Sequence, residues 1–150
     1  MPTHFHIIIQ ANEKSISERR SFGGKPMQEF AYRVGKLLSS YTQAINIQNN
    51  RSGSLFQQKT KAKILSEDVE GIIQNYLENC FFYVHNNPFE AGLVASLHDW
   101  LYSSYLDYIG KRNDTLCDKE IFFKLTGLTI NDILNRTENN ISDELIKKFY

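Results

Sequence analysis

The sequence contains few prolines, cysteines and tryptophans: three, two and one, respectively, among 150 residues. Its two cysteines, Cys80 and Cys117, lie far apart and form no CxxC pair. We therefore expect reduced structural thiols rather than a disulfide framework, and a cytoplasmic location is the simplest interpretation. The chain also lacks any apolar run close to the roughly 20 residues that span a bilayer. Its first residues, MPTHFH, lack the basic and then apolar pattern of a signal peptide.

A net charge is also absent, because 17 basic residues balance 17 acidic ones. Residues 13–63 contain ten basic and three acidic residues, a net charge of +7. Residues 64–150 contain seven basic and 14 acidic residues, a net charge of −7. A basic half joined to an acidic half suits a protein with one face against phosphate, although solvated surfaces account for most runs of charge.

Length and composition fit one globular domain with a small appendage, since 41% of the residues are hydrophobic and 23% are charged. The isoleucine-rich residues 3–10 predict a strand. The polar residues 11–27, which include two glycines and a proline, predict a loop. Apolar residues at helical spacing predict an amphipathic helix over residues 28–46, and NNRSGS predicts a turn over residues 49–54.

A second strand is predicted over residues 55–65, LFQQKTKAKIL. Alternation along a strand places Lys59, Lys61 and Lys63 on one face. Three lysines in line suit a surface that faces phosphate. An edge strand on which lysine prevents aggregation explains the same pattern equally well.

The rest of the chain predicts helices. One begins near Ser66 and stops near Asn86, because Pro88 follows. The aromatic-rich residues 99–110 fit either a short helix or an irregular stretch. Short amphipathic helices are predicted over residues 118–126, 130–136 and 142–149.

His4 and His6 form the sharpest feature of the first predicted strand. Two imidazoles at positions i and i+2 point the same way and can share one cation. With a phosphate oxygen as third partner, magnesium or manganese is favoured. Such a metal withdraws charge from a phosphodiester and orients it for attack. A lone HxH pattern is weak, however, and two ordinary strand histidines are the simpler alternative.

Tyr83 and Asn87 form the second constellation, within the run YVHNNP. They are four residues apart and so share a helix face. The phenol could attack phosphorus, and the carboxamide could be a third metal ligand. A phenol titrates near pH 10, so it needs a metal or nearby lysines to act as a phenolate. An aromatic helix face packed on a sheet is the alternative interpretation.

Four runs together resemble the signatures of the single-tyrosine HUH transposases, especially the REP-associated type. They are, in order, MPTHFHIII, GSLFQQKTKAKIL, YVHNNPFEAGLV and DWLYSSYLDYIG. The match covers residues 1–110, and four motifs in the family's order are far more specific than one HxH pair.

The resemblance implies an α+β fold with a ferredoxin-like sheet backed by helices. The transposase-like domain is expected over residues 1–110, and a helical C-terminal extension over residues 111–150. Relatives carry a strand, a helix and another strand before the histidine-bearing strand. The chain is therefore expected to be truncated at its N-terminus and to lack part of the sheet.

The resemblance also implies the site. Tyr83 becomes the nucleophile that forms a 5′-phosphotyrosine link, and His4, His6 and Asn87 become ligands of a magnesium or manganese ion. His85 either faces DNA or completes the site.

One departure from the family lies on the second predicted strand. Many relatives carry an aromatic residue where this chain has Thr60, so an attacking group expected on that strand is missing. Tyr83 is preferred because its spacing to Asn87 reproduces the family's helix arrangement.

The expected partners are single-stranded or hairpin DNA and a second copy of the chain, with no membrane. The residues expected to bind DNA are Lys36, Arg51, Lys59, Lys61 and Lys63. The leading hypothesis is a DNA transposase that nicks and rejoins strands. A truncated, catalytically inactive DNA-binding remnant is the alternative, and an interaction protein with structural histidines is a third.

Overall fold

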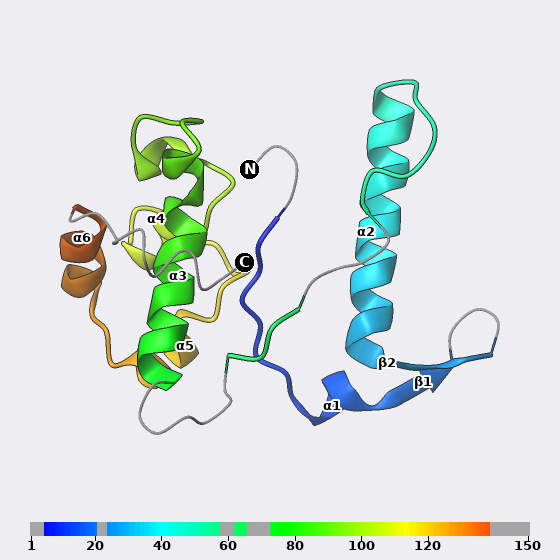
Figure 1. The fold of residues 1–150 in the computed structure, drawn as a ribbon, viewed down its shortest axis with the longest axis horizontal. Coiled ribbons are helices and arrows are strands. Elements are labelled where there is room, and N and C mark those ends of the chain that lie inside the picture. The colour runs from blue at the N-terminus through cyan, green and yellow to red at the C-terminus, as the bar shows by residue number, and fades with distance from the viewer. Residues whose placement is uncertain (1–4, 21–23, 58–61, 66–72, 139–150) are drawn as a thin grey trace. The chain divides into compact units, whose positions relative to one another are not determined.

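A computed structural model describes residues 5–20, 24–57, 62–65 and 73–138. The chain forms two compact units. Met1–Ile8 and Lys63–Tyr150 belong to the first, which we call the helical unit, and Ile9–Ala62 form the second, the hairpin unit. Figure 1 shows the elements of each unit. Each unit is described by itself below.

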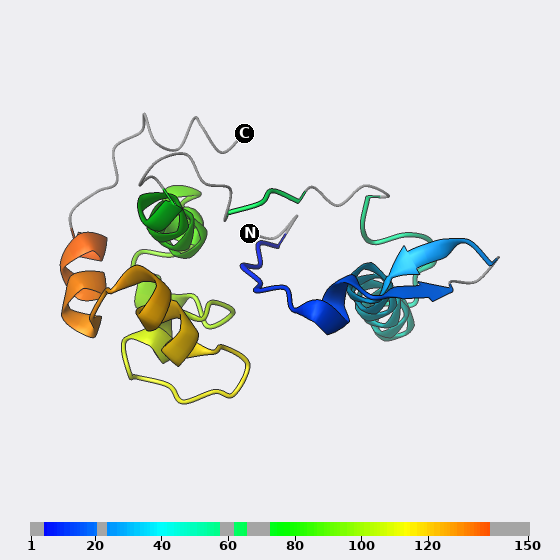
Figure 2. The same ribbon diagram turned by 90° about the horizontal axis from the view of Figure 1, so that it is seen from below.

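The hairpin unit begins with one helical turn, α1 (Glu13–Ile16), followed by β1 (Glu18–Arg20) and β2 (Pro26–Gln28). The two strands pair antiparallel, with Glu18 opposite Gln28. Figure 2 shows the hairpin at the end of α2 where that helix begins. The predicted loop over residues 11–27 is therefore wrong, because its polar residues form a hairpin. The signal was present, since a Gly-Gly pair between short polar runs is typical of a hairpin connection.

The helix α2 (Glu29–Gln48) confirms the prediction over residues 28–46. Its first residue ties it to the hairpin, because the Glu29 carboxylate accepts hydrogen bonds from Arg19 Nη1 at 3.0 Å and Arg33 Nε at 2.7 Å. The predicted turn follows the helix, with Asn50 at φ 46°. Asn50 donates its N–H to Ile47 O, and Arg51 donates to Asn46 O, which closes the helix in a Schellman motif.

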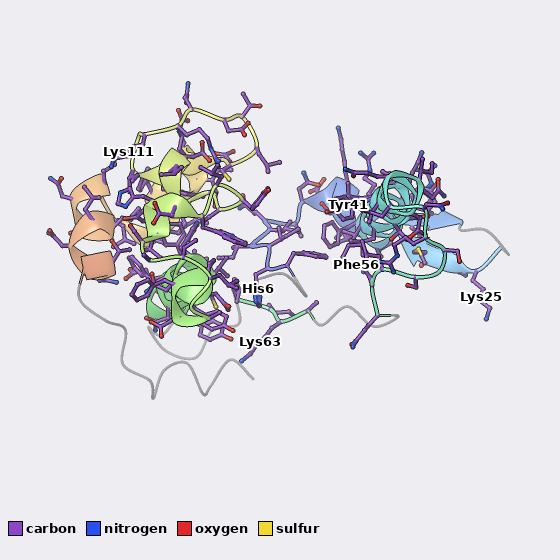
Figure 3. All side chains as sticks on the ribbon, turned by 90° about the horizontal axis from the view of Figure 1, so that it is seen from above. His6, Lys25, Tyr41, Phe56, Lys63 and Lys111 are labelled. Atoms are coloured by element: carbon purple, nitrogen blue, oxygen red, sulfur yellow. The ribbon has the colours of Figure 1, made fainter. Side chains whose placement is uncertain are left out.

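None of the described residues of the hairpin unit is buried. Tyr41 meets one aromatic neighbour, Phe56, with ring centroids 6.0 Å apart, as Figure 3 shows beside α2. A lone helix with a two-stranded hairpin has too few layers to enclose a core. Apolar side chains of α2 therefore stay open, and Leu37 is 62% exposed.

The helical unit contains the core. Its elements are α3 (Ile73–Glu90), the 3₁₀ turn η1 (Leu97–Asp99), α4 (Tyr105–Tyr108), α5 (Lys119–Thr126) and α6 (Ile130–Glu138). Aromatic rings dominate the interior, where Phe81 of α3 stacks on Phe122 of α5 with centroids 4.2 Å apart. The buried hydrophobic cluster consists of Phe81, Phe82, Leu97, Tyr105, Tyr108, Phe122, Leu128 and Ile133.

Two of the predicted late helices are confirmed. α5 begins after Asp118, whose carboxylate accepts the Ile121 N–H at 3.1 Å, and α6 places Ile133 fully inside the core. The predicted helical extension from residue 111 thus contains helices that share a core with α3. The helix predicted over residues 142–149 lies outside the described residues.

The predicted stop near Asn86 is wrong, because α3 continues through Pro88 to Glu90. Proline lacks the N–H that would donate to Val84 O, so the helix loses one hydrogen bond there and continues for two more residues. The cap that follows the helix lies at Gly92, whose φ of 66° favours glycine. Gly92 donates to Phe89 O, and Leu93 donates to Pro88 O, so the proline carbonyl belongs to the cap.

The two strands predicted over residues 3–10 and 55–65 are wrong where the structure describes them. Residues 5–10, 55–57 and 62–65 have no regular secondary structure. Alternating residues favour an extended backbone, but a strand also needs a hydrogen-bonded neighbour. Within the described ranges, β1 and β2 form the only ladder. The α+β class is confirmed in a mostly helical form, and a ferredoxin-like sheet is not confirmed.

The packing of α6 on the core leads to a stability prediction. Replacement of Ile133, which is completely buried, by alanine should lower the free energy of unfolding by about 2–5 kcal/mol. Urea unfolding followed by circular dichroism measures the change. Leu116→Ala is the control, because Leu116 is 88% exposed and its loss should cost less than about 0.5 kcal/mol. Equal effects of the two substitutions would contradict a core that includes α6.

Candidate functional site

One face of α3 carries four side chains with chemically reactive or polar groups. Tyr76, Cys80, Tyr83 and Asn87 follow one another at intervals of four, three and four residues. This spacing places them along a single stripe of a helix. Asn87 joins the stripe only because α3 continues past Asn86.

His6 lies against this stripe, although the segment that carries it is not a strand. Its ring meets the Tyr83 ring edge to face, with centroids 5.6 Å apart and planes at 78°. Its Nε2 lies 3.4 Å from Nδ2 of Asn87. Figure 3 shows His6 beside α3. Three of the four residues predicted to form the site are therefore brought together, and His4 lies outside the described residues.

The pair His6 and Asn87 fits part of a metal site. Two ligands on neighbouring corners of a small divalent cation, each about 2.1 Å from it, lie about 3 Å apart. The 3.4 Å separation is close to this value. Rotation of the amide by half a turn would present its oxygen in place of its nitrogen. No group of three His, Cys, Asp or Glu side chains that could hold a metal occurs among the described residues.

Tyr83 is the phenol of this group. It is half-buried on α3 with the imidazole of His6 against its ring. The arrangement therefore brings a phenol, an imidazole and a carboxamide into one contact group.

Lys63 reaches the same stripe two helical turns earlier. Its ammonium lies 5.0 Å from the centroid of the Tyr76 ring. Tyr76 precedes Tyr83 by seven residues, about 10 Å along a helix. Lys63 also acts on Cys80, which lies between Tyr76 and Tyr83 on the stripe.

Burial and Lys63 act in opposite directions on Cys80. Burial raises the pKa of the Cys80 thiol, and the nearby Lys63 charge opposes the rise. Cys80 and Cys117 are both free thiols, as predicted.

The other residues predicted to bind DNA lie elsewhere. Lys36 and Arg51 are exposed in the hairpin unit, on α2 and just after it. Neither forms a salt bridge with a described residue. Lys59, Lys61 and Thr60 lie outside the described residues.

His85 belongs to the core and not to the site, which corrects the expectation that it faces DNA or completes the metal site. It follows Tyr83 by two residues, about 200° around a helix, and is only 4% exposed. Its Nδ1 donates to Phe81 O at 2.7 Å, so its Nε2 accepts from the Ser104 hydroxyl at 2.8 Å. Both ring nitrogens of His85 thus form hydrogen bonds within the core. In the sequence, His85 lies four residues after Phe81 on the same helix face, and this spacing was the available signal for a core position.

Sequence reasoning missed a clamp between α4 and the loop after it. The carboxylate of Asp107, 2% exposed, accepts two hydrogen bonds from Arg112 Nε at 3.0 and 3.1 Å and one from the Asp114 N–H at 2.9 Å. The Arg112 guanidinium holds the pKa of Asp107 below its usual value. An acidic residue five positions before an arginine, with a glycine between them, was the available signal.

No described helix is both long and apolar enough to cross a membrane. No protein-family model, curated protein or solved structure matches the chain. The contacts of the described residues are therefore the basis of any functional argument.

The burial of His85 leads to a prediction for stability against pH. Burial lowers the pKa of His85 to about 4, although its hydrogen bond to Phe81 opposes the shift. In the unfolded chain the His85 imidazole is protonated below about pH 6.5, whereas in the folded chain it stays neutral down to about pH 4. Stability should therefore decrease as the pH falls from about 6.5 to about 4, by up to about 3 kcal/mol.

Urea unfolding at several pH values measures this slope. His85→Gln removes the titration and should flatten the curve over that interval, whatever its effect at neutral pH. His98→Gln is the matched control, because His98 is less buried and the slope should remain. Asp107 would add a separate loss only at lower pH, because its pKa is depressed. An unchanged slope in His85→Gln would contradict the assignment.

Proposed function

We propose that the protein is a DNA transposase-like enzyme that binds single-stranded or hairpin DNA, nicks it and rejoins it through a 5′-phosphotyrosine intermediate. One observation carries the proposal: His6 contacts both Tyr83 and Asn87. These residues lie 77 or more positions apart in the sequence, so their meeting is not a consequence of local structure. The ordered signatures over residues 1–110 add support.

In the proposed reaction the Tyr83 hydroxyl attacks a backbone phosphorus. A bond forms between the phenolic oxygen and phosphorus, and the bond from phosphorus to the 3′ oxygen breaks. The 3′ oxygen leaves and takes up a proton as a free hydroxyl, while the phenol gives up its own. Attack by a 3′ hydroxyl reverses these changes and rejoins the strand.

A divalent metal, magnesium or manganese, completes the proposed site. His6 and Asn87 would hold it, with His4 as the expected third ligand. When bound, such a metal neutralises charge on the phosphate and favours an ionised phenol. The near-contact of the two donors supports this part of the proposal.

The finer fold prediction, a ferredoxin-like sheet, belongs to the same proposal. Residues of the two segments predicted as strands, His6 and Lys63, both meet the stripe of α3. A helix that backs a sheet receives side chains from neighbouring strands in this way. We infer that these two segments lie where strands of a ferredoxin-like sheet would cover α3.

Basic residues would hold the DNA backbone. Residues 13–63 carry a net charge of +7, which favours phosphate. Within them we assign DNA contacts to Lys36, Arg51, Lys59, Lys61 and Lys63. The free thiols of Cys80 and Cys117 fit a reducing, cytoplasmic setting for this activity.

A DNA-binding remnant without catalysis is the second candidate. The described residues alone provide two potential ligands, His6 and Asn87, and no complete metal cluster. Such a protein would bind DNA through its basic residues, with a steep dependence on salt and none on metal.

Covalent capture tests the enzymatic proposal. Incubation with 3′-labelled hairpin DNA and manganese should yield a labelled protein–DNA adduct on a denaturing gel, because a 5′-phosphotyrosine link retains the 3′ part of the strand. Tyr83→Phe should abolish the adduct, because it removes only the attacking oxygen. Tyr76→Phe is the matched control, since Tyr76 lies on the same stripe and should be dispensable. An adduct that survives Tyr83→Phe would refute the nucleophile, and DNA binding without any adduct would favour the remnant.

Metal dependence gives the same assay a second readout. His6→Ala and Asn87→Ala should each raise the manganese concentration needed for adduct formation by at least about tenfold to 100-fold, because loss of a ligand costs no less than loss of a residue that only orients one. His98→Ala should leave that concentration unchanged. If the wild type and all three variants need the same manganese concentration, His6 and Asn87 do not bind the metal.

We also propose a homodimer formed through α2. Its apolar residues Phe30, Val34, Leu37 and Tyr41 recur at intervals of four, three and four, which suits a helix-to-helix seam. Phe30, Leu37 and Tyr41 are 37, 62 and 53% exposed in the hairpin unit. A second α2 would cover them.

Sedimentation velocity tests the seam. Leu37→Lys should convert dimer to monomer, because it places a charge in the seam. Ser39→Lys adds the same charge to the other side of α2, where Ser39 is exposed, and should leave the dimer intact. A monomeric wild-type protein would show that α2 is not a dimer seam.

A further inference from the structure

The loop before α4 exposes apolar side chains that the core does not use. Leu101 is 68% exposed and Tyr102 is 89% exposed. Trp100 is half-buried, and its ring meets that of Tyr102 edge to face with centroids 5.4 Å apart and planes at 73°. Because Tyr102 is so exposed, much of its ring surface is open to solvent.

The backbone of this loop is fixed on both sides of Tyr102. Arg112 donates from Nη1 to Leu101 O at 2.9 Å and from Nη2 to Ser103 O at 2.7 Å. The same guanidinium is held by the buried carboxylate of Asp107. A loop pinned by one guanidinium can present a ring at a small entropic cost, which favours binding.

The loop is also fixed to the helix that carries the proposed nucleophile. The Ser104 hydroxyl donates to His85 Nε2 at 2.8 Å. His85 lies between Tyr83 and Asn87 in the sequence and points to the other side of α3. The loop therefore lies about one helix diameter, roughly 10 Å, from the Tyr83 side.

We propose that the exposed Tyr102 ring, with the Trp100 ring against it at a steep angle, is a stacking platform for an unpaired nucleobase, next to the DNA segment that reaches Tyr83. The inference rests on the proposed function and adds the residues that hold a flanking base. Aromatic faces bind bases of any sequence through their π-surfaces. Asp99, exposed beside Trp100, would repel a phosphate, so the contact should involve the base and not the backbone.

The distance between platform and nucleophile determines what the platform does. A base held about a helix diameter from Tyr83 is not at the scissile phosphate. The platform should therefore increase DNA affinity and set the path of the strand, without changing the chemical step. Trp100 and Tyr102 are positioning residues in this scheme.

Trp100 is the only tryptophan in the chain, so it reports directly on stacking. The probe is a single-stranded oligothymidylate added to the full-length protein. We expect the strand to quench Trp100 fluorescence, and we expect a duplex of equal length to quench it much less. Tyr102→Ala should raise the dissociation constant about tenfold, the usual effect of removing one stacking ring.

Two controls keep the test specific. Leu116→Ala removes a side chain of similar exposure, 88%, from another loop and should bind the strand as the wild type does. Tyr102→Ala should form the tyrosine adduct at the wild-type rate once DNA is saturating. Because Tyr102 is almost fully exposed, its substitution should not disturb folding, which circular dichroism can verify.

The outcomes separate the platform from the function. If the wild-type protein binds no single-stranded DNA, both the platform and the proposed function are wrong. Wild-type binding with no quenching and no effect of Tyr102→Ala overturns the platform and leaves the function standing. Equal quenching by duplex and single strand also overturns the platform. If Tyr102→Ala changes the oligomeric state and leaves DNA affinity unchanged, the platform is overturned as well, because the loop is then a protein contact.

Discussion

The contact of His6 with Tyr83 and Asn87 depends on one helix, α3, and on where that helix ends. Residues spaced like Tyr83 and Asn87 share a face only while the helix continues, and α3 continues through Pro88. The opposite face of the same helix is fixed in the aromatic core by Phe81 and its stacking on α5. The core therefore sets the rotation of α3, and the rotation decides which side chains His6 can meet.

The sequence predicts helices better than strands in this chain, for a physical reason. Helical hydrogen bonds are local, so the apolar period of residues 28–46 is enough to predict α2. A strand depends on a distant partner, and residues 5–10 lack one among the described residues. The polar hairpin β1–β2 was missed because it buries no apolar face. For the site, spacing predicted that Tyr83 and Asn87 lie together, whereas the core role of His85 depended on the packing of Ser104 against it.

The hairpin unit shows how charge and packing can be separated within one chain. Ile9–Ala62 contain nine basic and three acidic residues, a net charge of +6, and none of their described residues is buried. Most helical stability in proteins comes from packing of an amphipathic face, so burial of the apolar side of α2 against a partner would stabilise this unit. The proposed functions supply two partners, another α2 for its apolar side and DNA for its charge. Both would make the order of the unit depend on its partner.

The two parts of the proposed DNA site differ in how firmly they are held, and this difference has a consequence for mechanism. Tyr102 stands on a backbone fixed by Arg112 at two carbonyls. His6 stands on an irregular segment whose position near Asn87 rests on side-chain contacts. Ordering such a segment costs conformational entropy, which ligand binding must offset, so metal and DNA should stabilise the His6 segment as they bind. Assembly of the catalytic group would then follow capture of the strand on the rigid side of α3.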